Sequence, residues 1–403
     1  MMVSGMQIGP NDNVAQVLSK TGRARQWLAE RPTVPDDVAC LESTRTVFRV
    51  SAHIAEDTPA VRSVFKPAFA RLEAVTGGRI AAEEHWGGSL HPERDGAKAL
   101  RGGVTDFCPV YSAWSPDEFP AAQVLALPFL FPSAELATTI SEELYSRLFK
   151  EDVERQGILM GRMVSTGCCN LFSRVPIRGR GDLLQGRVAC TDGIESDAFR
   201  ALGAEPVPCS TPEAVRLFGA GQVLALSISD SAAHTTGAYR FARYRTSIDM
   251  IRLSLEYCLS PSFYDRLPLP LKRALNDWLR GLAQVGAQIF YGLEGARARE
   301  EFALSGIETV CIAPEEEVGW RLALEPLKAD FDTGSARGAL VSDIRSLVTR
   351  YGGLSSDELM DQAIASPRRD MLPGLQRAPA EDAAQQRADS LPGLRDEVMD
   401  KGP

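Results

Sequence analysis

The chain has 403 residues, of which 44% are hydrophobic and 24% charged, a composition typical of globular proteins and not of disordered or fibrous ones. Its 53 acidic residues outnumber the 44 basic ones and leave a net charge of −9, which argues against nucleic acid as a partner because phosphate binding depends on positive charge. Single hydrophobic cores stop growing at about 250 to 300 residues, so the length favours two lobes with a cleft between them.

Patterns for membrane insertion, secretion and metal binding are weak. The best apolar run, residues 124–131, is far shorter than the roughly 20 residues of a membrane span, and Pro128 interrupts it. Residues 1–16 lack the continuous apolar stretch of a secretory signal peptide, so either the signal is absent or the precursor starts elsewhere. The eight cysteines include no Cys-x-x-Cys spacing, and we expect neither a metal nor a cofactor.

The first part of the chain alternates strand and helix patterns after a peripheral extension, residues 1–45, that holds one short helix. The first long helix is clearly delimited, because Thr58 before Pro59 is a typical start and Gly77-Gly78 a typical stop, while Pro67 predicts a kink. The alternation predicts a parallel sheet covered by helices. Its elements are expected at residues 47–50 (strand), 59–76 (helix), 79–84 (strand), 92–100 (helix) and 104–110 (strand).

A second α/β series follows a helix at residues 134–156 and a strand at residues 158–164. Two similar series in one chain predict two α/β lobes. The elements of the second series are expected at residues 187–190 (strand), 194–202 (helix), 206–209 (strand), 212–218 (helix, capped by Thr211) and 223–229 (strand).

The last third of the chain holds one long helix and a polar tail. Apolar residues recur at helical spacing over residues 270–304, which at about 1.5 Å per residue gives a helix of about 50 Å, long enough to lie along both lobes. Beyond Tyr351 the sequence has no aromatic residue and few large aliphatic ones. We therefore expect a mobile acidic tail over residues 346–403, dispensable for folding beyond about residue 352.

Motifs for catalysis are weak as well. Gly219-Ala220-Gly221 precedes a strand, whereas a dinucleotide-binding loop follows one. Asp230 and His234 lie one helical turn apart, and a solvated or capping pair explains them better than a metal site. The Gly-x-Ser-x-Gly motif of many hydrolases is missing. We predict a binding protein without catalytic residues, not an enzyme.

Several phrases of sequence, in this order, resemble the substrate-binding subunits of tripartite ATP-independent periplasmic (TRAP) transporters, the dicarboxylate-binding-protein-like family. The likeness covers about residues 46–340. The phrases that carry it are Thr76-Gly77-Gly78-Arg79-Ile80, Gly87-Gly88-Ser89-Leu90, Ala99-Leu100-Arg101-Gly102-Gly103-Val104-Thr105-Asp106, Leu127-Pro128-Phe129-Leu130-Phe131, Asp182-Leu183-Leu184-Gln185-Gly186, Leu202-Gly203-Ala204-Glu205-Pro206-Val207, Leu267-Pro268 and Gly306-Ile307-Glu308-Thr309-Val310.

The resemblance implies an α/β, two-lobed periplasmic-binding-protein-like fold that closes over a small organic solute and hands it to the permease subunits of a TRAP transporter in the membrane. Its implied location is the periplasm. The implied organisation is an N-terminal extension (residues 1–45), lobe I (46–166), lobe II (167–251), a shared region with hinge strands, the long helix and C-terminal elements (252–345), and the tail (346–403).

The resemblance also implies ligand-binding positions. Members that bind carboxylates use an arginine on the strand after Gly186 and often another upstream, and here these positions fall on Cys190 and about Cys169. A ligand without a simple carboxylate is therefore expected, unless its charge meets Arg162 or Arg174. Apolar lining is the favoured role of the two thiols, ahead of a disulfide or a soft-metal site. Matching positions add four further candidate ligand contacts: Asp57, Tyr111, Ser227 and Ser229.

Two other functions stay open at this point. An enzyme on the same bilobed fold would need acid, base or nucleophilic groups that converge on the cleft. A cytoplasmic ligand-sensing or adaptor module would explain the missing signal, the N-terminal extension and the acidic tail.

Overall fold

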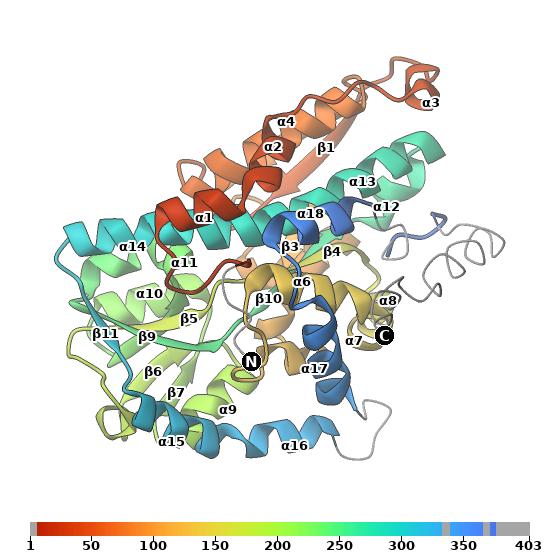
Figure 1. Ribbon diagram of the computed structural model, residues 1–403. Coiled ribbons are helices and arrows are strands. Elements are labelled where there is room, and N and C mark those ends of the chain that lie inside the picture. The colour runs from red at the N-terminus through yellow and green to blue at the C-terminus, as the bar shows by residue number, and fades with distance from the viewer. Residues whose placement is uncertain (1–5, 333–338, 366–370, 376–403) are drawn as a thin grey trace, which may run out of the picture.

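The chain folds into two lobes, each built on one sheet of mixed parallel and antiparallel strands. The computed structural model describes residues 6–332, 339–365 and 371–375 and shows two α/β lobes (Figure 1). In the first sheet, ordered β2-β1-β3-β10-β4, β1 pairs in parallel with β2 and β3, whereas β10 runs antiparallel to β3 and β4. Its strands are β1 (Thr46–Ser51), β2 (Ile80–His85), β3 (Phe107–Val110), β4 (Leu159–Ser165) and β10 (Ser254–Leu259).

The second sheet has the order β11-β9-β5-β8-β6-β7. β6 pairs in parallel with β7 and β8, and β9 with β11, while β5 is antiparallel to both of its neighbours. Its strands are β5 (Cys169–Ser173), β6 (Arg187–Cys190), β7 (Glu205–Pro208), β8 (Ala225–Ser229), β9 (Tyr244–Ile251) and β11 (Glu308–Cys311). The parallel pairing expected for the first strand–helix series is therefore confirmed for β1, β2 and β3. The antiparallel pairs involve β10 and β5, which lie outside the predicted series and enter the sheets from the crossing segments between the lobes.

Two short segments carry the chain between the sheets. β4 of the first sheet continues into β5 of the second through residues 166–168, and β9 returns to β10 through residues 252–253. The two segments bond to each other, because the Thr166 amide donates to the Leu253 carbonyl (2.8 Å) and the Leu253 amide donates to Thr166 Oγ1 (2.9 Å). Short paired crossings of this kind are where hinge rotation between lobes occurs.

Helices cover both sheets. Those before β5 are α1 (Val14–Lys20), α2 (Gly22–Ala29), α3 (Asp36–Ala39), α4 (Lys66–Val75), α5 (Gly96–Arg101), α6 (Ala134–Glu143), α7 (Tyr145–Leu148) and α8 (Lys150–Gln156). Those after it are α9 (Ile194–Ala201), α10 (Thr211–Gly219), α11 (Asp230–Thr235), α12 (Pro261–Arg266), α13 (Leu269–Val285), α14 (Glu294–Leu304), α15 (Pro314–Leu324), α16 (Pro326–Asp332), α17 (Leu340–Tyr351) and α18 (Ser356–Ala365). None of the described helices is long and apolar enough to cross a membrane.

Shorter helical segments complete these elements. The 3₁₀ segments are η2 (Glu93–Asp95), η3 (Ser112–Trp114), η4 (Ala122–Ala126), η5 (Arg180–Leu183) and η6 (Ala238–Phe241). A π-helical segment, η1 (Val61–Phe65), leads directly into α4, and Pro67, which has no amide to donate, lies at this change of helix type. The single helix expected over residues 134–156 is wrong, since it is divided into α6, α7 and α8.

The long helix is confirmed as an uninterrupted helical run over residues 269–304, in which α13 passes through the π-helical segment η7 (Gly286–Leu293) into α14. Figure 1 shows it lying along both lobes. Trp278 anchors it to lobe I by donating from Nε1 to the Ala68 carbonyl (2.7 Å). Gly161 of β4 permits the close approach, because a Cβ there would lie 2.7 Å from Leu279 Cδ1.

Both ends of the described chain pack on this helix. In α18, Leu359 and Met360 are fully buried. Met360 belongs to the apolar cluster of α13, whereas Leu359 belongs to the cluster that includes α6 and α17. In α2, Trp27 lies against Gly281. The expectation of a mobile tail is therefore wrong for residues 346–365, which form the end of α17 and α18 and bury Tyr351, Leu359 and Met360. Residues 366–370 and 376–403 of that expected tail lie outside the described residues.

Candidate ligand-binding cleft

A cavity of about 120 Å³ lies between the two sheets and the long helix. Its walls come from the ends of β1 and β3 in lobe I, from the ends of β6 and β8 in lobe II, and from Phe290 and Tyr291 of η7. The lining is mostly apolar. For scale, a dry apolar cavity of roughly 150 Å³ takes up benzene.

The lobe I wall carries a chain of three polar side chains. Tyr111, which follows β3, and His53, which follows β1, meet through Tyr111 Oη and His53 Nδ1 (2.8 Å). His53 Nε2 lies 3.2 Å from Glu93 Oε1 of η2. Burial lowers the pKa of His53, which favours a neutral ring that accepts from Tyr111 at Nδ1 and points its Nε2 proton at Glu93. Trp114 packs against Tyr111 with ring centroids 4.7 Å apart.

Glu93 also joins the two lobes. Its Oε2 accepts a hydrogen bond of 3.0 Å from the backbone amide of Thr211, the first residue of α10 in lobe II. The unsatisfied amides of a helix N-terminus attract a carboxylate, so this contact favours the closed arrangement of the lobes.

The lobe II wall combines Leu226 and Ile228 of β8 with small side chains: Cys169, Cys190, Cys209, Ser227 and Ser229. All eight cysteines of the sequence lie within the described residues, and all are free thiols. Burial raises the pKa values of Cys169 and Cys190, so both thiols are protonated near neutral pH. They therefore present apolar, weakly polar surface, and the disulfide considered for this pair is not formed.

A buried carboxyl group supports the lobe II wall from behind. Glu195 of α9 accepts hydrogen bonds from the Thr191 amide (2.7 Å), the Thr191 hydroxyl (2.7 Å) and the Ser227 hydroxyl (2.6 Å). Burial raises the pKa of Glu195, although these hydrogen bonds act in the opposite direction. The strand ends at Thr191 and Ser227 are thereby held in place.

The residues that line the cavity include neither arginine nor lysine. Arg162 is buried beside Glu142, with Nε and Oε1 3.7 Å apart, and Arg174 lies over the Phe218 ring and donates to the Gly219 carbonyl. Neither arginine considered as a partner for a ligand carboxylate lines the cavity. Among the described residues that line the cavity, His53 is the one side chain that could carry a positive charge, and burial lowers its pKa.

Five of the six residues predicted from the sequence line this cavity: Tyr111, Cys169, Cys190, Ser227 and Ser229. Asp57 is exposed in the turn after β1 and does not line it. Sequence reasoning missed Glu93 and Thr235, which have no recognisable motif. It also missed Cys209, although Cys209 follows a strand parallel to the one that ends at Cys190, and the same strand-end argument applies to it.

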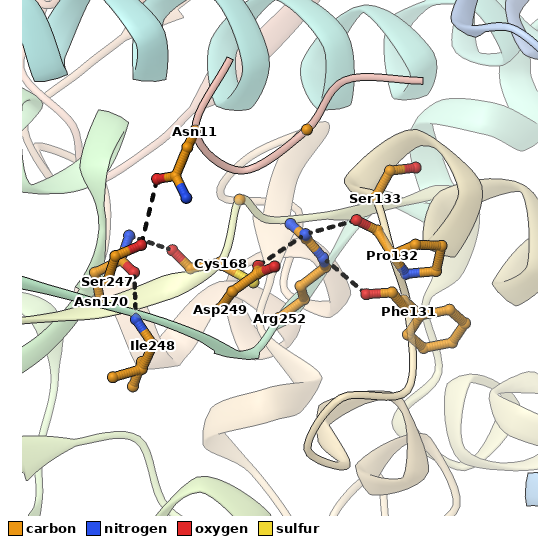
Figure 2. A network of polar contacts seen from close by, with 12 residues as sticks. Asn11, Phe131, Pro132, Ser133, Cys168, Asn170, Ser247, Ile248, Asp249 and Arg252 are labelled. Carbon is orange, nitrogen blue, oxygen red and sulfur yellow. Dashed lines mark hydrogen bonds and ion pairs between the residues drawn. The ribbon is translucent and has the colours of Figure 1, made fainter. Parts of the chain in front are cut away.

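Behind the cavity, a polar network surrounds the return crossing (Figure 2). Arg252 donates to the Phe131 and Pro132 carbonyls at 3.4 and 3.1 Å and lies 3.3 Å from Asp249 Oδ1. Asp249 has a positive φ of 43°, an uncommon conformation for a residue other than glycine. The network fixes the sharp change of direction between β9 and β10.

The described residues contain no group of three or more histidine, cysteine or acidic side chains that could hold a metal ion. Asp230 is buried and pairs with Arg245 (2.6 Å) and Arg299 (3.1 Å), while His234 stacks on Tyr239. The expectation that Asp230 and His234 form a solvated or capping pair is therefore wrong. Asp230 is buried, and its partners are Arg245 of β9 and Arg299 of α14 instead of His234.

Two α/β lobes, two hinge crossings and a cavity at their junction define the class of bilobed solute-binding proteins. The chain belongs to the DctP family, the bacterial extracellular solute-binding proteins of family 7, whose model matches residues 50–333. This is the dicarboxylate-binding-protein-like family that the sequence resembles.

Solved structures of TRAP solute-binding proteins share the fold. One from a marine metagenome, in complex with 3-hydroxybenzoate, has 18% identity and a TM-score of 0.71 over 77% of this chain and 99% of its own. One from Bordetella bronchiseptica with bound mandelate has 18% identity and a TM-score of 0.68 over 76% and 99%. One from Rhodoferax ferrireducens with copurified benzoate has 15% identity and a TM-score of 0.66 over 79% and 97%.

Proposed function

We propose that this protein captures a small, largely apolar organic solute without a carboxylate group in the periplasm and delivers it to the permease subunits of a TRAP transporter. The observation that carries the ligand class is the lining of the cavity, which has aromatic and thiol side chains but neither arginine nor lysine. A carboxylate enclosed there would lack the guanidinium fork that normally compensates it, and an unpaired buried charge costs several kcal/mol.

The ligands of the solved relatives favour an aromatic ring, whereas their carboxylate group is the feature that the lining of this cavity does not suit. Their bound ligands 3-hydroxybenzoate, mandelate and benzoate are aromatic acids. The aromatic wall of Tyr111, Trp114, Phe290 and Tyr291 suits a planar ring by stacking or edge contacts. The lobe II wall offers hydroxyl and thiol groups in place of a cation.

Matched ligands test this proposal. Calorimetric titration with 3-hydroxybenzoate and 3-hydroxybenzyl alcohol compares an acid and an uncharged compound of the same ring. Mass spectrometry of solutes that copurify with the natively folded protein identifies the natural ligand. We expect the uncharged compound to bind at least tenfold more tightly and the copurified solute to lack a carboxylate. Tighter binding of the acid, or a copurified carboxylate, overturns the proposed ligand class.

We also propose that the solute leaves the protein chemically unchanged. The thiols on the cleft wall are protonated because burial raises their pKa values, and the neighbouring carboxyl group of Glu195 raises the pKa of Cys169 further instead of activating it as a nucleophile. Incubation of the copurified solute with fresh protein, followed by mass spectrometry, should return the same mass. A new product that depends on the protein concentration would show turnover instead.

A further inference from the structure

We infer that Glu93 selects the solute by charge: its carboxylate rejects anionic solutes and accepts a hydrogen bond from a hydroxyl or amino group of the solute. The inference rests on the proposed function and names the group that discriminates in the same cavity. Selection by charge would then come from lobe I. The lobe II positions where the family resemblance implies arginines are occupied here by Cys169 and Cys190, which carry no charge.

The first step is the position of Glu93. It is 8% exposed and lines the cavity, although it belongs to the short segment η2 between β2 and α5. Among the residues that line the described cavity, Glu93 is the one carboxylate side chain. The other charged groups nearby are held away from the lining or buried behind it, as Glu195 is.

The second step is the set of partners of Glu93. Oε2 is occupied by the Thr211 amide of lobe II, so closure holds the carboxylate in the cavity instead of releasing it to solvent. Oε1 is buried and makes no hydrogen bond of good geometry within the described residues; its nearest partner is His53 Nε2 at 3.2 Å. One oxygen therefore retains capacity for a donor.

The third step is the effect on a ligand. An anion enclosed beside Glu93 meets a like charge in a poorly solvated space, with no arginine or lysine in the lining to offset it. A hydroxyl or ammonium group of the solute can instead donate a hydrogen bond to Oε1, whose contact with His53 Nε2 at 3.2 Å is not a hydrogen bond of good geometry, and hydrogen bonds to a carboxylate are the stronger kind. A hydrogen-bond donor on the solute is thus favoured and a carboxylate is disfavoured.

The experiment uses three probes with one ring: 3-hydroxybenzoate, 3-hydroxybenzyl alcohol and 3-hydroxybenzylamine. Each is titrated calorimetrically into the wild type, Glu93→Gln and Glu93→Asp. Glu83→Gln is the matched control, since Glu83 also lies beside a histidine, with Oε1 2.8 Å from His85 Nε2, but is exposed on β2. Thermal melting confirms that each variant is folded.

In the wild type we expect the alcohol and the amine to bind at least tenfold more tightly than the acid. Glu93→Gln should narrow this ratio at least tenfold, while Glu93→Asp and Glu83→Gln should keep it. If the wild type prefers the alcohol and Glu93→Gln leaves the ratio unchanged, the role of Glu93 is wrong and the proposed function stands. If the wild type prefers the acid, the proposed function itself fails.

If none of the probes binds the wild type, the comparison is made on solutes retained from one cell extract. The wild type and Glu93→Gln are each passed through the extract, washed and analysed by mass spectrometry. Carboxylates retained by Glu93→Gln alone support the inference. An identical set of retained solutes in the two proteins overturns it.

Discussion

The two walls of the cleft are built from different chemistry on similar frames. Lobe I presents large aromatic rings and the chain formed by Tyr111, His53 and Glu93, whereas lobe II presents thiols and hydroxyls at the ends of short strands. Large rigid groups define shape, and small groups leave space. We therefore expect lobe I to determine which solute fits and lobe II to close over it.

The helices that pack on the outside of the two lobes also differ. The terminal helices α2 and α18 pack on α13 beside lobe I, where Trp278 joins the helix to the aromatic cluster of the first sheet. Lobe II is packed instead by α9, α10 and the far part of the long helix. We therefore expect the terminal helices to stabilise lobe I more than lobe II.

The largest effect should come from truncation after Gly353, which removes α18. Leu359 and Met360 are fully buried, and burial of each such side chain contributes about 1.5 to 3 kcal/mol, so their loss is comparable with the 5 to 15 kcal/mol stability of a whole domain. We expect the truncated chain to melt far below the full chain or to aggregate, as followed by circular dichroism.

Two controls separate α18 from the residues after it. A chain that ends at Leu375 keeps the contacts described for α18 and should melt like the full chain. The single substitution Met360→Ala should cost about 2 to 5 kcal/mol, whereas Leu304→Ala, at a position 84% exposed, should cost little. Equal melting of the full chain and the chain truncated after Gly353 would contradict the bracing of lobe I.

Each lobe also holds a buried carboxyl group behind its wall, and the one in lobe I predicts a pH effect. Glu256 of β10 accepts hydrogen bonds from the Ser112 amide (2.8 Å) and hydroxyl (2.7 Å), and burial raises its pKa to about 7. Because the folded state then binds the proton more tightly than the unfolded state, stability falls as the pH rises from about 4.5 through 7.

The substitution Glu256→Gln removes this titration and keeps a similar shape. From pH 5 to pH 8, the free energy of unfolding should shift in favour of the variant by about 2 to 3 kcal/mol, as measured by urea unfolding. Glu195→Gln in lobe II should shift in the same direction, since burial also raises its pKa. The exposed Glu118→Gln is the control, and a parallel pH profile for Glu256→Gln and wild type would refute the assignment.

A smaller effect is expected when the lobe II wall receives a cation. Cys190→Arg places a guanidinium at the strand end where the family resemblance implies one, and binding of 3-hydroxybenzoate should tighten at least tenfold. Cys311→Arg adds the same charge to the exposed strand β11 and should leave that affinity unchanged. No gain for Cys190→Arg would mean that this strand end does not meet the ligand.

Much of the fold was predictable because its elements have strong local patterns. The strand over residues 187–190 and the long helix follow from alternation and helical spacing alone. By contrast, β5 and β9 were missed, since their pairing depends on partners about 60 to 80 residues away in the sequence. Glu93 was missed for a similar reason: its role depends on the Thr211 amide, which folding brings to it from the other lobe.

The smallest effect concerns a hydroxyl without a partner. Thr235 lines the cavity from α11, and its buried Oγ1 makes no hydrogen bond within the described residues. A ligand that supplies the missing partner gains a hydrogen bond, so Thr235→Val should weaken binding of the copurified solute about two- to tenfold, in line with the roughly 0.5 to 1.5 kcal/mol of one hydrogen bond. The melting temperature should stay the same or rise.

Thr236→Val is the matched control, because the neighbouring Thr236 also lines the cavity but its hydroxyl already donates to the Ala232 carbonyl (2.8 Å). Equal affinities of Thr235→Val and the wild type would show that the Thr235 hydroxyl makes no hydrogen bond to the solute, which would sharpen the contrast between the two walls.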